Sequence, residues 1–172
     1  DYDGIVAGAA PVHGLTERSL AGDLWTYTVA HDDAGKPLLA AQDIEVLHRA
    51  VVAACDEDDG IEDGLIGDPR TCRFDPSTLA LSSQKIETIK KIYAGPTEPK
   101  GAADFAGQVL GSELGWGRTI AGIGFVTQGT EGMRYLFLDP PPGPSWNVKE
   151  FDIARDYKRF GMFDSILGAT NP

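Results

Sequence analysis

The stretch CDEDDGIEDGLIGDPRTC, from Cys55 to Cys72, constrains what this chain can fold into more than any other part of the sequence. It contains both cysteines of the chain, seven acidic residues and three glycines, and apolar Ile61, Leu65 and Ile66 interrupt it. Acidic runs are usually solvated surface. Carboxylates this close together repel one another, however, so the alternative is that a bound cation compensates the repulsion.

The spacing of the acidic residues fits a hard cation. Asp56, Asp59 and Asp63 are separated by short steps, and Gly60 and Gly64 follow two of them, which lets the backbone turn sharply. Carboxylate and carbonyl oxygens on a tight loop suit calcium, which takes about 6–8 oxygen ligands. The EF-hand pattern does not match, because an isoleucine and an arginine stand where it needs ligands. A solvated loop and a calcium loop of another kind both stay open.

The state of the two cysteines, bridged or free, indicates in which cellular compartment the protein is found. A chain of 172 residues can bury a core without many disulfides, and it has no C-x-x-C pair and no metal spacing among its three histidines. A bridge that fastens the two ends of an ion loop would contribute about 3 kcal/mol in the chain-entropy picture. It would also imply a secreted or periplasmic protein. Two free, buried thiols are the alternative.

Composition excludes several kinds of partner. The formal net charge of −11 argues against a nucleic acid or an anionic membrane surface as the partner. No apolar run approaches the roughly 20 residues of a membrane-spanning helix. The chain begins at Asp1 without a methionine and without a visible signal peptide. We therefore expect it to be part of a longer protein.

The hydrophobic pattern predicts mostly helices around a little sheet. Helices are expected within 16–33, over 42–55 and over 83–94, and a further helix with an irregular tail within 146–168. The third is the clearest, because Ser82 or Ser83 can cap it, Ile86 and Ile89 lie on one face, and Gly95 can end it. Short strands are expected at 5–9 and at 133–138, where prolines follow. The stretch 96–132 is rich in glycine and reads as irregular.

No catalytic apparatus is visible in the chain. The nearest approach to the G-x-S-x-G nucleophile turn is GPSWN at 143–147, which lacks the last glycine and is flanked by prolines. His48 precedes the acidic loop on an expected helix, where a surface or half-buried role is more common than that of a general base. The glycines do not form a phosphate-binding loop.

Four stretches together resemble the tannase and feruloyl esterase family: DYDGIVAGAAP, the tryptophan-bearing helix after it, CDEDDGIEDGLIGDPRTCRFDP, and GSELGW. The resemblance implies an α/β-hydrolase core with a Ser-Asp-His triad and a large inserted lid. We therefore expect an α+β, mostly helical lid domain with a small sheet at 13–163, a stub of a core strand at 1–12 and a return segment at 164–172. The nucleophile would precede Asp1 and the catalytic Asp and His would follow Pro172, so this chain would hold no catalytic residue.

The same resemblance implies a structural calcium ion in a loop closed by a disulfide between the two cysteines. Asp56, Asp59 and Asp63 would be its side-chain ligands, and Ile61 and Leu65 would supply backbone carbonyls. The apolar side chains of these last two residues would then face the core.

The lid of this family also supplies the wall that recognises the aromatic part of the substrate. Arg134 suits a carboxylate or a phenol, and for each aromatic side chain core packing is the alternative. The candidate residues for this wall are Trp116, Arg134, Tyr135, Phe137 and Trp146.

Two functions follow from these observations. The first is the lid part of a secreted serine carboxylic-ester hydrolase that acts on aromatic or phenolic esters, with the hydrolase core of the same protein as its partner. The second is an independent, calcium-stabilised binding module without catalysis. A buried-type strand at 5–9 favours the first, because alone it would present an unpaired edge.

Overall fold

Helices and single helical turns, joined by loops such as 60–75 and 138–147, are the main regular structure of the computed structural model, which describes residues 4, 15–96, 107–117 and 123–160. The only extended pairing in these ranges is a single antiparallel bridge between His31 and Pro37, so the small sheet that we expected is not found there. The expected strand at 5–9 lies outside the described residues. The helices are α1 (Leu15–Val29), α2 (Ala41–Cys55), α3 (Ser83–Ala94), α5 (Ile123–Gly132) and α6 (Ile153–Asp156), and the single turns are η1 (Asp56–Asp59), η2 (Pro76–Thr78), η4 (Glu113–Gly115), η5 (Met133–Phe137), η6 (Val148–Glu150) and η7 (Tyr157–Arg159).

The first three helices confirm the prediction from hydrophobic spacing. In α3 the Ser82 hydroxyl accepts a hydrogen bond from the Lys85 N–H, which satisfies one of the free donors at the start of the helix. Gly95 ends the helix with a φ of 72°, a backbone conformation that favours glycine. Ile86 and Ile89 are buried on the inner face.

The strand expected at 133–138 was wrong, because Met133–Phe137 form one turn of π-helix that continues α5. Met133 and Phe137, four positions apart, are buried, whereas Tyr135 and Leu136 are exposed. This is the spacing of a helix face, since a strand would alternate buried and exposed residues.

The helix α5 lies in a stretch that the sequence indicated to be irregular. Its glycines allow close packing here and do not break the helix. A Cβ added at Gly129 would lie 3.1 Å from Leu24 Cδ2 of α1, and one at Gly132 would lie 2.1 Å from Phe137 Cε2. A side chain at Gly132 would therefore displace the Phe137 ring, whereas one at Gly129 would require Leu24 of α1 to shift by a few tenths of an ångström.

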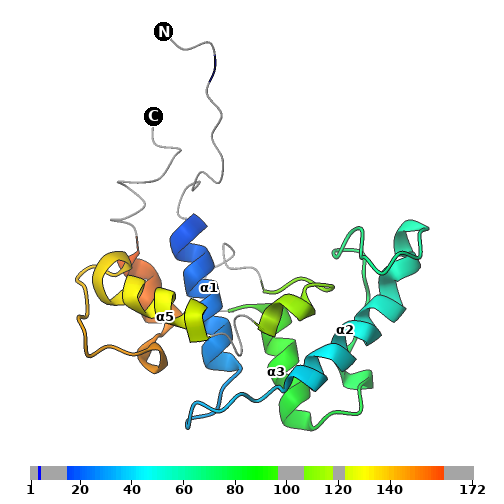
Figure 1. The fold of residues 1–172 in the computed structure, drawn as a ribbon, viewed down its shortest axis with the longest axis horizontal. Helices are drawn as coiled ribbons and strands as arrows, with labels where there is room; N and C mark the ends of the chain where they lie inside the picture. Colours follow the sequence, from blue (N-terminus) through cyan, green and yellow to red (C-terminus); the bar gives the residue numbers. More distant parts are fainter. Residues whose placement is uncertain (1–3, 5–14, 97–106, 118–122, 161–172) are drawn as a thin grey trace.

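Two hydrophobic cores share α1, which runs between them (Figure 1). The first core lies between α2 and α3 and includes the end of α1, and the second joins α1, α5 and the segment from 133 to 160. The buried side chains of the first are Ala30, Leu39, Ile44, Leu47, Val51, Cys55, Cys72, Ile89, Ile92 and Trp116, and those of the second are Ala21, Leu24, Met133, Phe137, Leu138, Trp146, Phe151 and Ile153.

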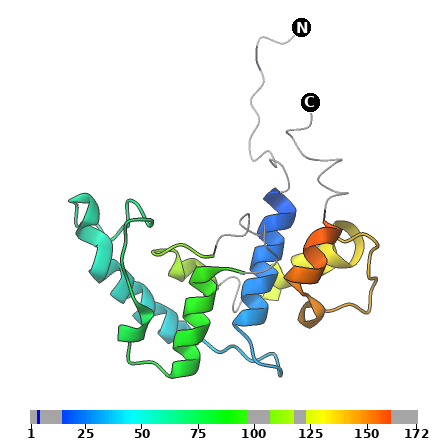
Figure 2. The same cartoon turned by 180° about the vertical axis from the view of Figure 1, so that it is seen from behind.

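The start of α1 and the end of the described chain near residue 160 lie on the same side of the molecule (Figures 1 and 2). Phe160 packs against the core that contains Ala21 and Leu24, which agrees with this arrangement. The acidic turn after α2 lies at the end of the molecule away from α5 (Figure 1). No helix in the described ranges has the length and apolar character needed to cross a membrane.

Candidate functional site

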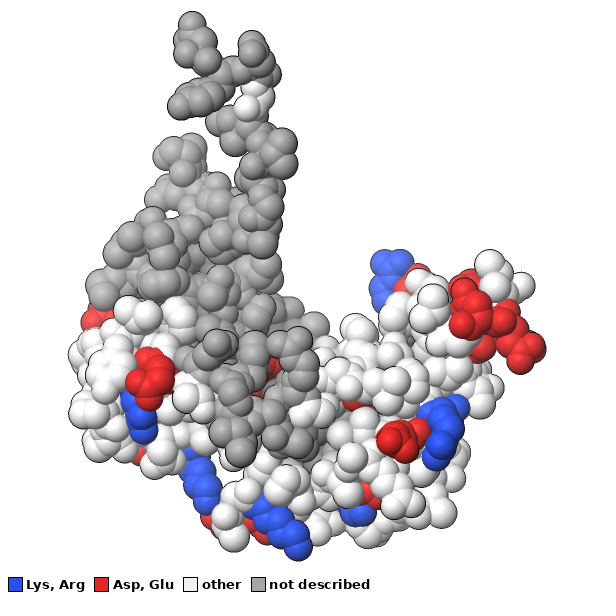
Figure 3. All heavy atoms as spheres, in the orientation of Figure 1, with Lys and Arg blue, Asp and Glu red and all other residues white. Residues whose placement is uncertain are grey.

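A disulfide between Cys55 and Cys72 closes the acidic loop, with a Cα–Cα distance of 5.4 Å. Both cysteines are buried in the core between α2 and α3, so the bridge ties the loop to the body of the molecule. Acidic side chains gather beyond the end of α2 (Figure 3). The disulfide of the expected ion loop is thus confirmed.

The loop carboxylates accept hydrogen bonds from backbone N–H groups. Asp56 Oδ1 accepts from the Gly64 N–H at 2.9 Å, which ties the far side of the loop back to the end of α2. Asp59 and Asp63 each accept from the N–H two residues further on, both at 3.0 Å. Such Asx turns organise a loop that has few backbone bonds of its own.

Asp68 makes the same kind of turn and also pairs with Arg70, whose guanidinium donates to both carboxylate oxygens at 2.8 and 2.7 Å. These hydrogen bonds hold the pKa of Asp68 at about 2.

Carboxylate and carbonyl oxygens, which this loop offers, are the ligands that calcium prefers. In the described structure, however, the loop carboxylates do not come together around one position. Asp56, Asp59 and Asp63 hold separate N–H groups, and within the described ranges no three His, Cys, Asp or Glu side chains come together as a metal site requires. Asp59 and Asp63 each use only Oδ1 for these hydrogen bonds. The calcium ligands expected from the sequence therefore stay a prediction.

The side chains of Ile61 and Leu65 do not face the core as we expected, because they are 59% and 67% exposed. Both residues donate their backbone N–H to the Asx turns at Asp59 and Asp63. The apolar residue that does turn inward is Ile66, which packs against the first core.

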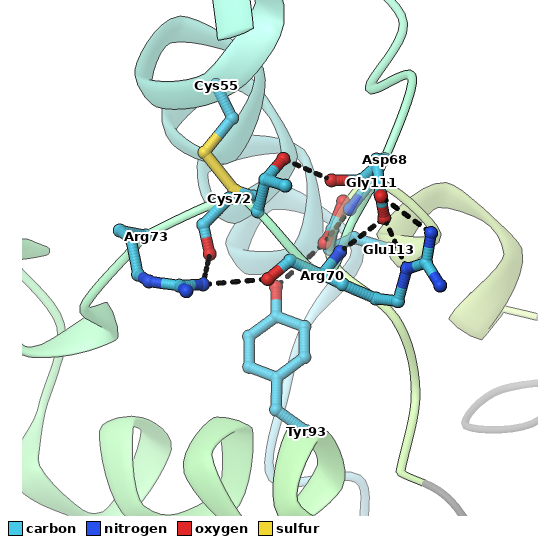
Figure 4. The surroundings of a disulfide bond; sticks show 9 residues. Cys55, Asp68, Arg70, Cys72, Arg73, Tyr93, Gly111 and Glu113 are labelled. Atoms are coloured by element: carbon cyan, nitrogen blue, oxygen red, sulfur yellow. Dashed lines mark hydrogen bonds and ion pairs between the residues drawn. A yellow bond between two sulfur atoms is a disulfide. The ribbon is translucent and has the colours of Figure 1, made fainter.

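Glu113, which no sequence pattern singled out, accepts three hydrogen bonds beside the first core. It is fully buried. Its Oε2 accepts from His48 Nδ1 of α2 at 2.8 Å, and its Oε1 accepts from the Tyr93 hydroxyl of α3 and from the Gly111 N–H, both at 2.7 Å. One carboxylate thus holds two helices and a turn together. Figure 4 shows Tyr93 rising from α3 toward Glu113, near the disulfide.

Tyr93 and Trp116 complete this cluster. Burial, and then the hydrogen bond to the Glu113 carboxylate, raise the pKa of Tyr93 far above its usual value, so the hydroxyl stays a donor at neutral pH. The ring of Tyr93 meets Trp116 edge to face at 5.1 Å. The Trp116 indole N–H donates to the Ser112 hydroxyl at 3.0 Å, so this candidate substrate residue is a packed core side chain with its polar atom satisfied.

Three other candidate substrate residues meet in the second core. Arg134 Nε donates to the Trp146 carbonyl at 2.6 Å, and Phe137 and Trp146 are buried in the same cluster. Arg134 also pairs with Glu131 at 2.6 Å. Tyr135, half exposed, lies on the outer side of the π-turn.

The Trp146 indole nitrogen is a buried donor with no acceptor among the described residues. Only 4% of the Trp146 surface is exposed. A buried donor without an acceptor costs about 1–3 kcal/mol, so such a group calls for an explanation. Its acceptor would have to come from outside the described chain.

Comparison with known proteins places these observations in a family. Residues 1–124 match the sequence profile described as tannase and feruloyl esterase. The chain is 30% identical over 166 residues to mono(2-hydroxyethyl) terephthalate hydrolase of Piscinibacter sakaiensis, covering 80% of this chain and 26% of that protein. It is 26% identical over 162 residues to probable feruloyl esterase B-2 of Aspergillus flavus, covering 89% of this chain and 30% of that protein.

The fold has solved counterparts. The crystal structure of feruloyl esterase B from Aspergillus oryzae superimposes on 91% of this chain with a TM-score of 0.74, at 19% sequence identity, and this chain covers 32% of it. A second esterase structure from the same species gives a TM-score of 0.71 at 22% identity. The chain thus spans about a quarter to a third of the length of these relatives.

Proposed function

The chain belongs to the tannase and feruloyl esterase family, and from this membership we propose that it forms the lid of a serine carboxylic-ester hydrolase that acts on aromatic or phenolic esters. The observation that carries the proposal is the family match over residues 1–124, which contain the acidic loop and the Glu113 cluster. The α/β-hydrolase core and its triad would belong to the remainder of a longer protein.

The positions of the chain ends support an inserted domain. An insertion must leave its host and return to it at neighbouring points, and the start of α1 and the end of the described chain lie on one side of the molecule (Figure 2). We assign 13–163 to the lid, 1–12 to a core strand and 164–172 to the return segment. The catalytic core of the same protein would be the partner on that side.

Within this proposal, the second core provides the wall against the substrate. The Trp146 indole N–H would donate to an oxygen of the bound ester, which gives this buried donor the acceptor that it lacks among the described residues. Arg134, held by the Trp146 carbonyl, and Tyr135 would line the same wall. Trp116 lies in the other core, and we assign it to packing.

The test compares the full-length protein with the 172-residue chain. We expect the full-length protein to hydrolyse feruloyl and p-nitrophenyl esters and to take up one fluorophosphonate label on a serine outside this chain. The chain alone should do neither. A stoichiometric label on any serine of this chain would overturn the proposal.

Trp146→Phe tests the substrate wall, because it keeps an aromatic ring and deletes only the N–H. We expect kcat/KM of the full-length enzyme to fall about 5- to 30-fold, which corresponds to one lost hydrogen bond of about 1–2 kcal/mol. Trp116→Phe is the matched control, since it also deletes an indole N–H but lies in the other core. It should lower the melting temperature and leave kcat/KM unchanged. An equal effect of both variants on kcat/KM would contradict the assignment.

We also propose that the acidic loop holds a structural calcium ion and that the protein is secreted or periplasmic. Asp56, Asp59 and Asp63 would supply carboxylates, and Ile61 and Leu65 backbone carbonyls; when bound, the ion neutralises much of the repulsion between these acids. The disulfide supports an oxidising compartment, where such bonds persist.

A further inference from the structure

A hollow of about 320 Å³ opens between the disulfide loop, α3 and the segment 107–111. Apolar and aromatic side chains form its walls, and none of the five candidate substrate residues lines it. Phe74 comes from the chain just after the disulfide, Tyr93 from α3, and Val109 and Leu110 from the segment that leads to Glu113. We name this hollow the Tyr93 pocket.

The walls of the Tyr93 pocket are fixed on three sides. The Cys55–Cys72 bridge anchors the loop chain between Arg70 and Phe74. The Tyr93 hydroxyl is held by Glu113, as Figure 4 shows. On the third side, the Gln108 N–H donates to a carbonyl of α3 at 3.0 Å. A pocket built in this way loses little conformational entropy when a ligand enters.

Two cations stand at this pocket in a chain whose net charge is −11. Arg70 uses Nε and Nη2 for Asp68, so its Nη1 has no partner among the described residues. The Lys90 ammonium is exposed and makes no hydrogen bond in the described ranges. Asp75, whose carboxylate accepts the Ser77 N–H, attracts Lys90 electrostatically but forms no ion pair with it within the described ranges. Donors are therefore available at the rim of an apolar hollow.

We propose that the Tyr93 pocket binds a small aryl carboxylate. The ring of the ligand would pack against Phe74 and Tyr93, and its carboxylate would meet Lys90 and the free Nη1 of Arg70. The volume lies at the lower end of the range of about 300–1,000 Å³ that is typical of small-molecule sites. The cations select an anion, and the apolar walls select an aromatic one.

The test is a titration of the 15N-labelled 172-residue chain with 4-hydroxycinnamate, followed by NMR. The chain also contains the proposed substrate wall around Trp146, so the residues whose amide signals shift distinguish the two sites. We expect saturable shifts at the amides of Tyr93 and 108–110. The neutral methyl ester of the same acid should bind at least threefold more weakly.

Variants separate charge from shape. Lys90→Gln should weaken binding about two- to fivefold, as expected for one partly solvated ion pair. Lys91→Gln, the neighbouring cation on α3 that does not line the pocket, should change nothing. Val109→Trp should fill the hollow and weaken binding at least tenfold.

Equal affinity for the acid and its methyl ester, or shifts confined to other residues, would overturn the proposal. If near-UV circular dichroism shows that the chain alone lacks fixed aromatic packing, the acid is titrated into the longer protein. There the difference between the Lys90 and Lys91 variants decides in the same way, whether or not the protein proves to be an esterase.

Discussion

The Glu113 carboxylate is buried beside the first core and accepts hydrogen bonds from three donors. These are His48 of α2, Tyr93 of α3 and the Gly111 N–H. Glu113→Ala would strand the Tyr93 hydroxyl and the His48 ring N–H in a largely buried site. We expect a loss of about 2–4 kcal/mol in the free energy of unfolding, measured by urea denaturation. Glu113→Gln keeps the shape and should lose less.

Glu87→Ala, which removes an exposed carboxylate from α3, is the control for the Glu113 variants and should stay within about 0.5 kcal/mol of wild type. Similar losses for Glu87→Ala and Glu113→Ala would mean that the three hydrogen bonds do not set the stability of this core.

The lowered pKa of Asp43 predicts how the free energy of unfolding depends on pH. Burial disfavours its charged form, but hydrogen bonds from the Lys85 ammonium and the Ala40 N–H outweigh this and lower its pKa from the usual 3.8. A lowered pKa means that the stabilisation is present above about pH 4 and is lost as the pH falls through the folded-state value. We expect about 1 kcal/mol of acid-dependent stability from this pair, since Lys85 is one-third exposed.

The measurement is the urea midpoint between pH 5 and pH 2.5. Asp43→Asn should flatten this profile relative to wild type. Asp58→Asn, at an exposed acid that makes no hydrogen bond within the described ranges, should leave the slope unchanged. A wild-type slope in the Asp43 variant would show that other carboxylates carry the acid sensitivity.

Helices whose signals are local could be predicted from the sequence, and features that depend on distant contacts could not. The α3 helix has its cap, its apolar face and its terminal glycine within 82–95, so both its existence and its ends were predictable. In α5 the glycines suggested an irregular chain, because nothing nearby shows that Gly129 must admit Leu24 of α1. The π-turn was read as a strand, since a short apolar run does not distinguish the two.

The same division applies to the candidate site. The acidic loop and both of its cysteines lie within eighteen consecutive positions, so the sequence showed them together, and the family resemblance implied the disulfide. The partners of Glu113 lie 65 and 20 positions away, so no local pattern marked it. Pairing at such separations is decided by tertiary packing alone.

At the scale of the complete chain, we propose a different role for each of the two cores. The core that contains Trp146 lies on the side of α1 and α5, near the end of the described chain, where a catalytic core would meet the lid (Figure 1). The core that contains Glu113 is tied by the disulfide to the acidic loop at the other end. We therefore expect substitutions in the second core, around Trp146, to change catalysis and substitutions in the first core, around Glu113, to change stability.

Calcium should act through the first core, which contains the disulfide of the acidic loop, on the unfolding of the whole chain. A ligand that binds only the folded form stabilises it by about 2.7 kcal/mol at a hundredfold excess over its Kd, so EGTA should lower the melting temperature by roughly 5–10 °C. Calcium should restore it, and magnesium should restore less because it requires a tighter octahedral shell. Asp59→Asn and Asp63→Asn keep an oxygen for the Asx turns and remove only the charge, so they should shrink this shift without unfolding the loop. Asp58→Asn should leave the shift intact. An unmoved melting curve in protein that elemental analysis shows to be free of metal would leave the loop as a solvated surface held by its own backbone hydrogen bonds.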